Sequence, residues 1–121
     1  MNEMEKQTDI ITKLAQLMVD QIISPFESIV CEYEYLERYS TISSSLSVIL
    51  HGTRKYLETA AGFATDNVEL CMELRESMRF HTGGEWSSFT LSLAASGKAK
   101  TEFYYSQSAT PNRHTFRESN D

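Results

Sequence analysis

Histidine and cysteine side chains are the groups with which this chain could do acid–base, nucleophilic or metal chemistry. His51 falls at the end of a predicted strand, His81 near the end of a predicted helix, and His114 in a polar tail, so local spacing brings no two together. A catalytic dyad or metal site would therefore need partners from distant parts of the fold. Cys31 and Cys71 lie in apolar patterns without zinc-site spacing, which favours reduced core thiols over a disulfide.

The motifs of common enzyme classes are also missing from the sequence. It contains no nucleotide-binding glycine motif, no nucleophile elbow and no HExxH, and its Gly83-Gly84 pair is typical of a helix stop. We therefore expect a protein that is not an enzyme and that holds no cofactor and no metal. A small hydrolase stays open as an alternative, and it would require His51 or His81 to meet a carboxylate in a pocket.

A run of glutamates is the strongest charged pattern. Glu69, Glu73 and Glu76 follow one another at spacings of four and three residues, which stacks them along one side of a helix. Such a run is commonly a solvated helix face. The alternative is a negative stripe that takes the place of phosphate on a basic protein partner.

The acidic overall charge suits a basic partner or simply solubility. A net charge of -6 and a pI near 5.0 argue against a sequence-independent nucleic-acid binder, which needs clustered Lys and Arg. The start MNEMEKQTD lacks the pattern of a signal peptide, and no apolar run approaches the roughly 20 residues that span a bilayer. We expect a cytoplasmic protein that binds neither nucleic acid nor membrane, with one domain over residues 1–121 and a polar tail at 106–121.

The first half of the chain predicts a helix followed by three strands. Apolar residues at helical spacing predict an amphipathic helix over residues 3–24, before Pro25. Period-two alternation predicts strands over 28–38 and 41–50, joined by a turn at 38–40. A third, shorter strand is predicted over 55–59. The side chains that alternation assigns to the core here include Ile42, Leu46, Val48 and Leu50.

The second half predicts another helix and a hairpin. Thr65 and Asp66 are good helix caps, and Glu69 completes a capping box with Asp66, so the helix is expected to begin there. The element order is then helix, three strands, helix, two strands. This order predicts an α+β fold, an antiparallel sheet of about five strands with both helices on one face. We expect the core to contain Leu14, Leu17, Met18, Leu46, Val48, Leu74, Phe89, Leu91 and Phe103.

The last hairpin has only one register that buries its apolar side chains. A two-residue loop would place Glu102 opposite Leu91 on the buried face. A three-residue loop, Ala95-Ser96-Gly97, pairs Phe89 with Phe103 instead and puts Gly97 at positive φ in a glycine bulge. We predict the three-residue loop.

This register defines the other face of the sheet. That face is expected to be hydroxyl-rich, acidic, free of large apolar side chains and without a cleft, which suits docking or a merely solvated surface equally. Its expected residues are Glu32, Glu34, Ser43, Ser45, Ser47, Ser88, Thr90, Ser92, Glu102 and Tyr104.

Several features of the chain occur together: the element order, the helix that begins at Asp66, the tryptophan-led strand EWSSFTLSL, the turn SGKAKTEFYY and the tail TPNRHTFRE. In this combination the chain resembles the YezG-type immunity proteins of bacterial polymorphic toxin systems, among them contact-dependent inhibition immunity proteins. The resemblance implies a cytoplasmic antitoxin that binds a cognate secreted toxin, often a nuclease, and blocks its active site or substrate groove.

Two acidic surfaces are the candidate toxin contacts. One contains Glu32, Glu34 and Glu102 on the sheet, and the other is the helix stripe Glu69, Glu73 and Glu76. An aromatic anchor is expected beside them, Tyr104 first and Trp86 second, although Trp86 equally suits packing against the fold. A secretion-effector chaperone, which would hold an extended effector in an apolar groove, remains the main alternative function. The sequence leaves the toxin's identity and the oligomeric state open.

Overall fold

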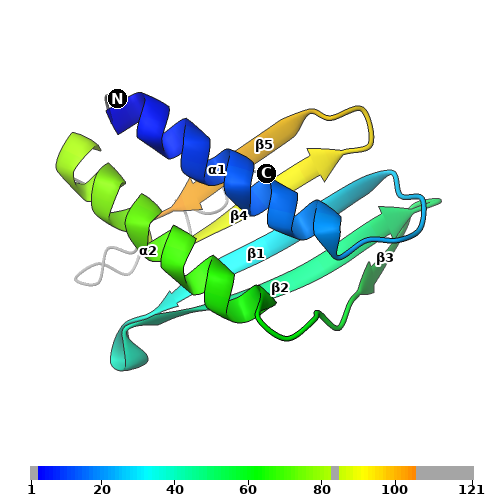
Figure 1. Cartoon of the computed structure of the whole chain (residues 1–121), viewed down its shortest axis with the longest axis horizontal. Helices are drawn as coiled ribbons and strands as arrows, with labels where there is room; N and C mark the ends of the chain where they lie inside the picture. Colours follow the sequence, from blue (N-terminus) through cyan, green and yellow to red (C-terminus); the bar gives the residue numbers. More distant parts are fainter. Residues whose placement is uncertain (1–2, 83–84, 106–121) are drawn as a thin grey trace.

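The protein forms two layers, a five-stranded antiparallel sheet and two helices that both lie on one of its faces (Figure 1). The structure is a computed structural model that describes residues 3–82 and 85–105. The strand order in the sheet is β3-β2-β1-β4-β5. The elements are α1 Glu3–Asp20, β1 Ser28–Leu36, β2 Thr41–Leu50, β3 Thr53–Tyr56, α2 Phe63–Thr82, β4 Ser88–Ala94 and β5 Ala99–Tyr104. The predicted α+β class and element order are confirmed, whereas the predicted tail and the Gly83-Gly84 stop lie outside the described residues.

Helix α1 packs on the sheet through side chains four residues apart. Ile10, Leu14 and Met18 are buried on one side of the helix, as the apolar spacing predicts. The helix ends at Asp20 and not at residue 24, because the N–H groups of Gln21 and Ile22 bond to carbonyls three residues back and tighten the last turn.

The central hairpin, β1–β2, has the predicted pairing but a shorter first strand. Cys31 lies opposite Leu46 and Glu34 opposite Ser43. Strand β1 stops at Leu36, and residues Glu37–Tyr39 form a single 3-10 turn. The turn closes at Ser40, which has the left-handed φ of 49° and donates its N–H to the carbonyl of Glu37 at 3.2 Å.

Strand β3 begins earlier than the sequence predicts. Its residues are Thr53–Tyr56 and not 55–59, because the connection from β2 is only two residues long, His51 and Gly52, both at positive φ. This is the backbone sign of the tight hairpin turns that match strand twist. Leu50, expected in the core, lies at the end of β2 beside this turn and keeps 39% of its surface exposed.

Ser47 corrects a second expectation about β2. It was predicted on the solvent side, yet its side chain is fully buried. Its hydroxyl donates to the Val30 carbonyl at 3.4 Å and accepts a 2.9 Å hydrogen bond from Nε of Arg54, whose strand β3 lies alongside. The long arginine side chain covers the serine, which a pattern of single residues could not indicate.

Helix α2 begins three residues before the predicted cap. Its first residue is Phe63, so Asp66 lies inside the first turn and donates its N–H to the Gly62 carbonyl at 2.9 Å. The predicted capping box at Asp66 is therefore wrong. Phe63 is only 4% exposed, and burial of its ring holds the additional residues in the helix.

The β4–β5 hairpin confirms the three-residue loop. Phe89 faces Phe103 and Leu91 faces Thr101. The N–H of Ala94 bonds to the Lys98 carbonyl at 2.8 Å, which encloses residues 95–97 as the loop, and Gly97 has a φ of +97°. Leu91 is fully buried, as this register requires.

The core contains an aromatic cluster at the end of the sheet near the β1–β2 turn. The ring of Phe89 stacks on Tyr33 at 4.5 Å and on Phe103 at 4.9 Å, and Trp86 meets it edge-on at 4.8 Å. Apart from Leu50, the predicted core residues are found in or against this core, with Leu17, Val48 and Phe103 partly buried at its margin. Neither helix in the described ranges is long and apolar enough to cross a membrane.

Candidate functional site

The face of the sheet opposite the helices carries two adjacent rows of polar side chains. Antiparallel pairing places one row across β2, β1, β4 and β5, and the residues two positions along each strand form the second row on the same face. The first row is Ser45, Glu32, Thr90 and Glu102, and the second is Ser43, Glu34, Ser88 and Tyr104.

These two rows enclose a shallow hollow of about 330 Å³. We call it the acidic hollow; it is lined by Glu32, Tyr33, Glu34, Ser43, Ser45, Ser88, Phe89, Thr90 and Tyr104. The expectation of a face without a cleft is therefore wrong. Small hydroxyl side chains stand between longer ones on a twisted sheet, so the longer side chains form walls around them.

The two carboxylates of the hollow differ in their surroundings. Oε1 of Glu32 lies 3.2 Å from Nη2 of Arg54, so its charge is partly balanced. Glu34 is exposed and makes no ion pair with any residue in the described ranges. The two residues are about 7 Å apart along the strand. Glu34 is therefore the carboxylate most available to an incoming cation.

Tyr104 forms the aromatic wall of the hollow, and Ser88 lies between it and Glu34. The backbone of Tyr104 is fixed by Ser87, whose N–H and hydroxyl both donate to the Tyr104 carbonyl, at 2.8 and 3.1 Å. The Oγ of Ser88 is buried and has no hydrogen-bond partner among the described residues. Glu102 belongs to the neighbouring row and is half-buried.

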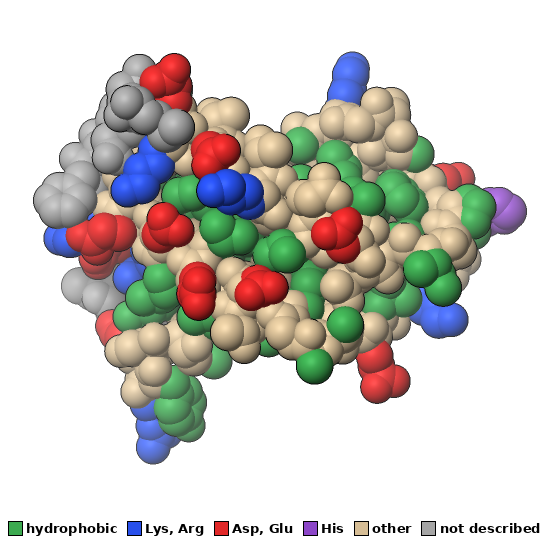
Figure 2. All heavy atoms as spheres, in the orientation of Figure 1, with side chains coloured by type: hydrophobic (Ala, Val, Ile, Leu, Met, Phe, Trp, Pro, Cys, Tyr) green, Lys and Arg blue, Asp and Glu red, His purple; other side chains and the backbone are tan. Residues whose placement is uncertain are grey.

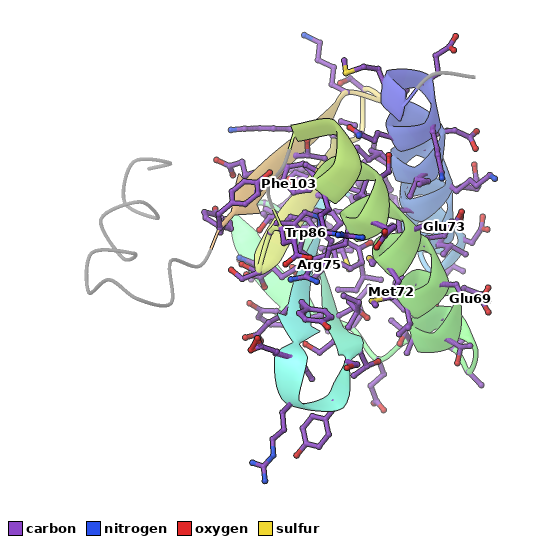
Figure 3. The ribbon with its side chains drawn as sticks, turned by 90° about the vertical axis from the view of Figure 1, so that its left-hand side faces the viewer. Glu69, Met72, Glu73, Arg75, Trp86 and Phe103 are labelled. Atoms are coloured by element: carbon purple, nitrogen blue, oxygen red, sulfur yellow. The ribbon has the colours of Figure 1, made fainter. Side chains whose placement is uncertain are left out.

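The glutamate stripe lies on the other side of the molecule. Glu69 and Glu73 project from α2 away from the sheet (Figure 3), and acidic side chains alternate with hydrophobic ones over this helix layer (Figure 2). Glu76 is paired with Arg79, which also lies 3.6 Å from Glu85. The structure therefore keeps the two predicted acidic surfaces apart, and a single flat partner cannot cover both.

A groove runs between the two helices beside this stripe. Its volume is about 360 Å³, and its lining is more apolar than polar. The lining residues are Lys13, Gln16, Leu17, Asp66, Glu69 and Leu70.

Trp86 belongs to the core and not to the surface. Its side chain is fully buried, so it is removed from the candidate toxin contacts. Arg75 of α2 lies against it (Figure 3), with Nε donating to the Trp86 carbonyl at 2.9 Å and the guanidinium carbon 3.7 Å from the ring centroid of Tyr35. The alternative that the sequence left open, packing against the fold, is the one observed.

The histidines and cysteines form no chemical centre in the described part of the chain. His51 is exposed in the β2–β3 turn, and no group of three His, Cys, Asp or Glu side chains able to hold a metal occurs in residues 3–82 and 85–105. Cys31 and Cys71 are reduced and buried, as predicted. Burial raises the pKa of the Cys31 thiol to about 11 and raises that of Cys71 further, so both thiols stay protonated at neutral pH.

The tip of the β1–β2 hairpin is an exposed feature that the sequence patterns did not indicate. Tyr39 is 68% exposed there, and the guanidinium carbon of Arg38 lies 5.8 Å from its ring centroid. A tyrosine in a turn, where alternation places no core residue, is the signal that could have indicated it.

Comparison with known proteins adds no family. No protein-family model matches the chain, and no curated protein is significantly similar to it. The fold and the acidic hollow therefore define the class, a small α+β protein with an open, acidic sheet face, and they carry the functional argument.

Proposed function

We propose that this protein is an immunity protein that binds a basic secreted toxin, of the nuclease class, and blocks its active site or substrate groove. The observation that carries the proposal is the acidic hollow on the uncovered face of the sheet. Nucleases bind phosphate with clustered basic side chains, and carboxylates on an inhibitor can occupy the same positions.

The geometry of the hollow suits a projecting lysine or arginine. Glu34 offers a carboxylate without an ion-pair partner in the described ranges, and the ring of Tyr104 stands one strand beyond Ser88 in the same row. The positions lie about 10 Å apart across two strand spacings, which leaves room for a cationic side chain between them. The short hydroxyl side chains allow the partner's backbone to approach closely.

The sheet face is favoured over the helix stripe for a physical reason. Glu73 is exposed on α2, Glu69 is exposed at the edge of the largely apolar helix groove, and Glu76 is already paired with Arg79. A concave site desolvates a cation more completely and therefore gains more from the same charge. We assign the primary contact to Glu32, Glu34, Glu102 and Tyr104.

Separate charge reversals test this assignment. The sheet variant is Glu32→Lys with Glu34→Lys and Glu102→Lys, and the matched helix variant is Glu69→Lys with Glu73→Lys and Glu76→Lys. Each is titrated by calorimetry against the toxin domain encoded by the adjacent upstream reading frame, and association rates are measured at low and high salt. We expect the sheet variant to associate slowly with little salt dependence and the helix variant to behave as the wild type.

The outcomes separate the function from the surface. If the wild-type protein does not bind the toxin domain, the proposed function is wrong. If it binds and only the helix reversal weakens binding, the sheet assignment is wrong and the stripe is the contact. Far-ultraviolet circular dichroism of both variants excludes unfolding as the cause.

The helix groove favours a second candidate, a secretion-effector chaperone. Leu17 and Leu70 provide apolar surface between α1 and α2 that an extended effector segment could cover. A chaperone binds its effector unfolded, whereas an immunity protein binds a folded toxin. Binding to the toxin domain before and after its denaturation discriminates the two.

A further inference from the structure

The tip of the β1–β2 hairpin has the composition of an interface anchor. We call residues 37–40 the hairpin tip: Glu37, Arg38, Tyr39 and Ser40. Its tyrosine is 68% exposed, and its arginine lies beside the ring. Tyrosine and arginine are enriched among the few residues that dominate protein–protein binding, since both offer large contact area together with a polar end.

The turn at the tip is closed by a hydrogen bond within the tip itself. The bond in this 3-10 turn runs from Ser40 to Glu37, and Ser40 adopts the left-handed region that side chains with a Cβ rarely occupy. Such strained positions persist where the surrounding structure fixes them, and they gather at functional sites. A turn that is already closed has less conformational entropy to lose on binding than an open loop.

The tip and the acidic hollow can belong to one interface. The last residue pair of the hairpin, Leu36 with Thr41, is two positions beyond the pair of Glu34 with Ser43 in the hollow. The tip is then within about 15 Å of the hollow at about 3.3 Å per strand residue. A standard interface covers about 800 Å² on each partner, a patch roughly 30 Å across.

The tip is also free of the helix layer. In both ribbon views the β1–β2 turn lies clear of α1 and α2, at the outer end of the hairpin (Figures 1 and 3). A projecting hairpin of this kind can enter a recess that a flat sheet face cannot reach.

We propose that the hairpin tip is a second anchor for the toxin. The tip inserts into a recess of the toxin, while the acidic hollow binds a basic side chain from the rim of that recess. The proposal rests on the immunity function proposed above. Tyr39 fills an apolar recess, and Arg38 pairs with an acidic group at its edge. A nucleic acid would attract Arg38 but would be repelled by Glu34 and Glu37, so the charges favour a protein.

Two matched tyrosine variants test the anchor. Tyr39→Ala removes the tyrosine ring of the hairpin tip. Tyr56→Ala removes a comparable ring on edge strand β3, since Tyr56 is 57% exposed and the guanidinium carbon of Arg54 lies 5.0 Å from its ring centroid. Affinity and dissociation rate are measured against the wild-type toxin domain. We expect Tyr39→Ala to weaken binding about thirtyfold or more, mainly through faster dissociation, and Tyr56→Ala to change it by less than about threefold.

The controls keep each outcome decisive. Both positions are exposed, so the melting temperatures of the variants are expected to stay near that of the wild type. If the wild type binds the toxin and Tyr39→Ala binds it as tightly as the wild type does, the anchor is wrong and the immunity function stands. If the wild type does not bind the toxin, both proposals are wrong. Binding of the wild type to a single-stranded oligonucleotide that is lost in Tyr39→Ala would show that the tip contacts nucleic acid instead and would overturn the protein partner.

Discussion

Arg75 and Trp86 are joined at two points across the boundary between α2 and the sheet. Nε of Arg75 donates to the Trp86 carbonyl at 2.9 Å, and the guanidinium carbon lies 5.9 Å from the indole centroid. The same guanidinium covers the ring of Tyr35. One side chain therefore fixes the backbone that leads into β4 and closes the aromatic end of the core.

Loss of this arginine is expected to destabilise the fold. Arg75→Met keeps most of the apolar stem but removes a charged hydrogen bond and a cation–π contact, so the free energy of unfolding should fall by about 1 to 3 kcal/mol. Urea unfolding followed by the fluorescence of the single tryptophan measures it. Arg79→Met on the same helix removes a solvent-exposed ion pair with Glu76 and should lower the free energy of unfolding much less than Arg75→Met does. An equal fall in the free energy of unfolding for Arg75→Met and Arg79→Met would contradict the role of Arg75.

Leu91 tests the register of the last hairpin. It is fully buried, so Leu91→Ala should lower the free energy of unfolding by about 2 to 5 kcal/mol through lost burial and the resulting cavity. Leu50→Ala is the matched control, because Leu50 is 39% exposed and should cost much less. Chemical denaturation of both variants compares them, and a Leu91 cost no larger than that of Leu50 would count against the packing.

Gly97 tests the loop. Its φ is +97°, and no heavy atom lies within 4 Å of the position a Cβ would take, so Gly97→Val is penalised by backbone strain without a clash. We expect a loss of about 1 to 2 kcal/mol in thermal or urea unfolding, with toxin affinity unchanged for the folded fraction. Ser96→Val is the matched control. Ser96 is not among the residues with positive φ, so this substitution should leave the stability nearly unchanged. A selective loss of toxin binding in Gly97→Val would instead place the loop in the interface.

Because both thiols are buried, we expect the protein to lose stability at alkaline pH. Burial raises the pKa of Cys31 from 9.0 to about 11 and raises that of Cys71 in the same direction. Well below pH 9 both thiols are protonated in both the folded and the unfolded state and contribute no pH dependence. Above it the unfolded chain releases protons that the folded chain keeps, so stability falls by up to about 1.4 kcal/mol per pH unit for each thiol.

A double substitution, Cys31→Ala with Cys71→Ala, tests this effect. Burial also raises the pKa of Tyr33, and Cys31 and Cys71 raise it further, so the variant loses the two thiols and part of the Tyr33 shift together. Urea unfolding at several pH values between about 8 and 11 should therefore give a shallower fall for the variant. Parallel curves would show that the thiols ionise as easily in the folded protein as in the unfolded chain.

The ion pair between Arg54 and Glu32 allows a test of how the acidic hollow attracts a partner. The Arg54 guanidinium lies 3.2 Å from Glu32, so Arg54→Ala leaves that carboxylate unbalanced. If the toxin contact is the hollow, association at low salt should become about two- to fivefold faster and more dependent on salt. Stopped-flow measurement of the association rate tests it. Lys98→Ala, at an exposed position next to the β4–β5 loop, changes the net charge by the same amount and separates the local from the global effect. Equal acceleration in both variants would argue against the hollow.

Patterns of period two and period 3.6 predicted most of the fold. Alternation placed Glu34 and Tyr104 on the open face, and the requirement that Leu91 be buried selected the loop of the last hairpin. The predicted start of α2 was wrong. A capping signal at Asp66 acts locally, whereas burial of Phe63 in the core contributes favourable free energy that extends the helix to residue 63.

The sequence by itself determined the element order, the faces of the strands and the acidic character of the surface, since side-chain periodicity and charge are properties of the chain. Only the tertiary structure decided which acidic groups share a site. Strand pairing set Glu34 and Tyr104 around one hollow, whereas packing buried Trp86 and left Tyr39 exposed at the hairpin tip. The reason is physical: distances between strands, and the burial of a side chain under its neighbours, depend on contacts between residues far apart in the chain.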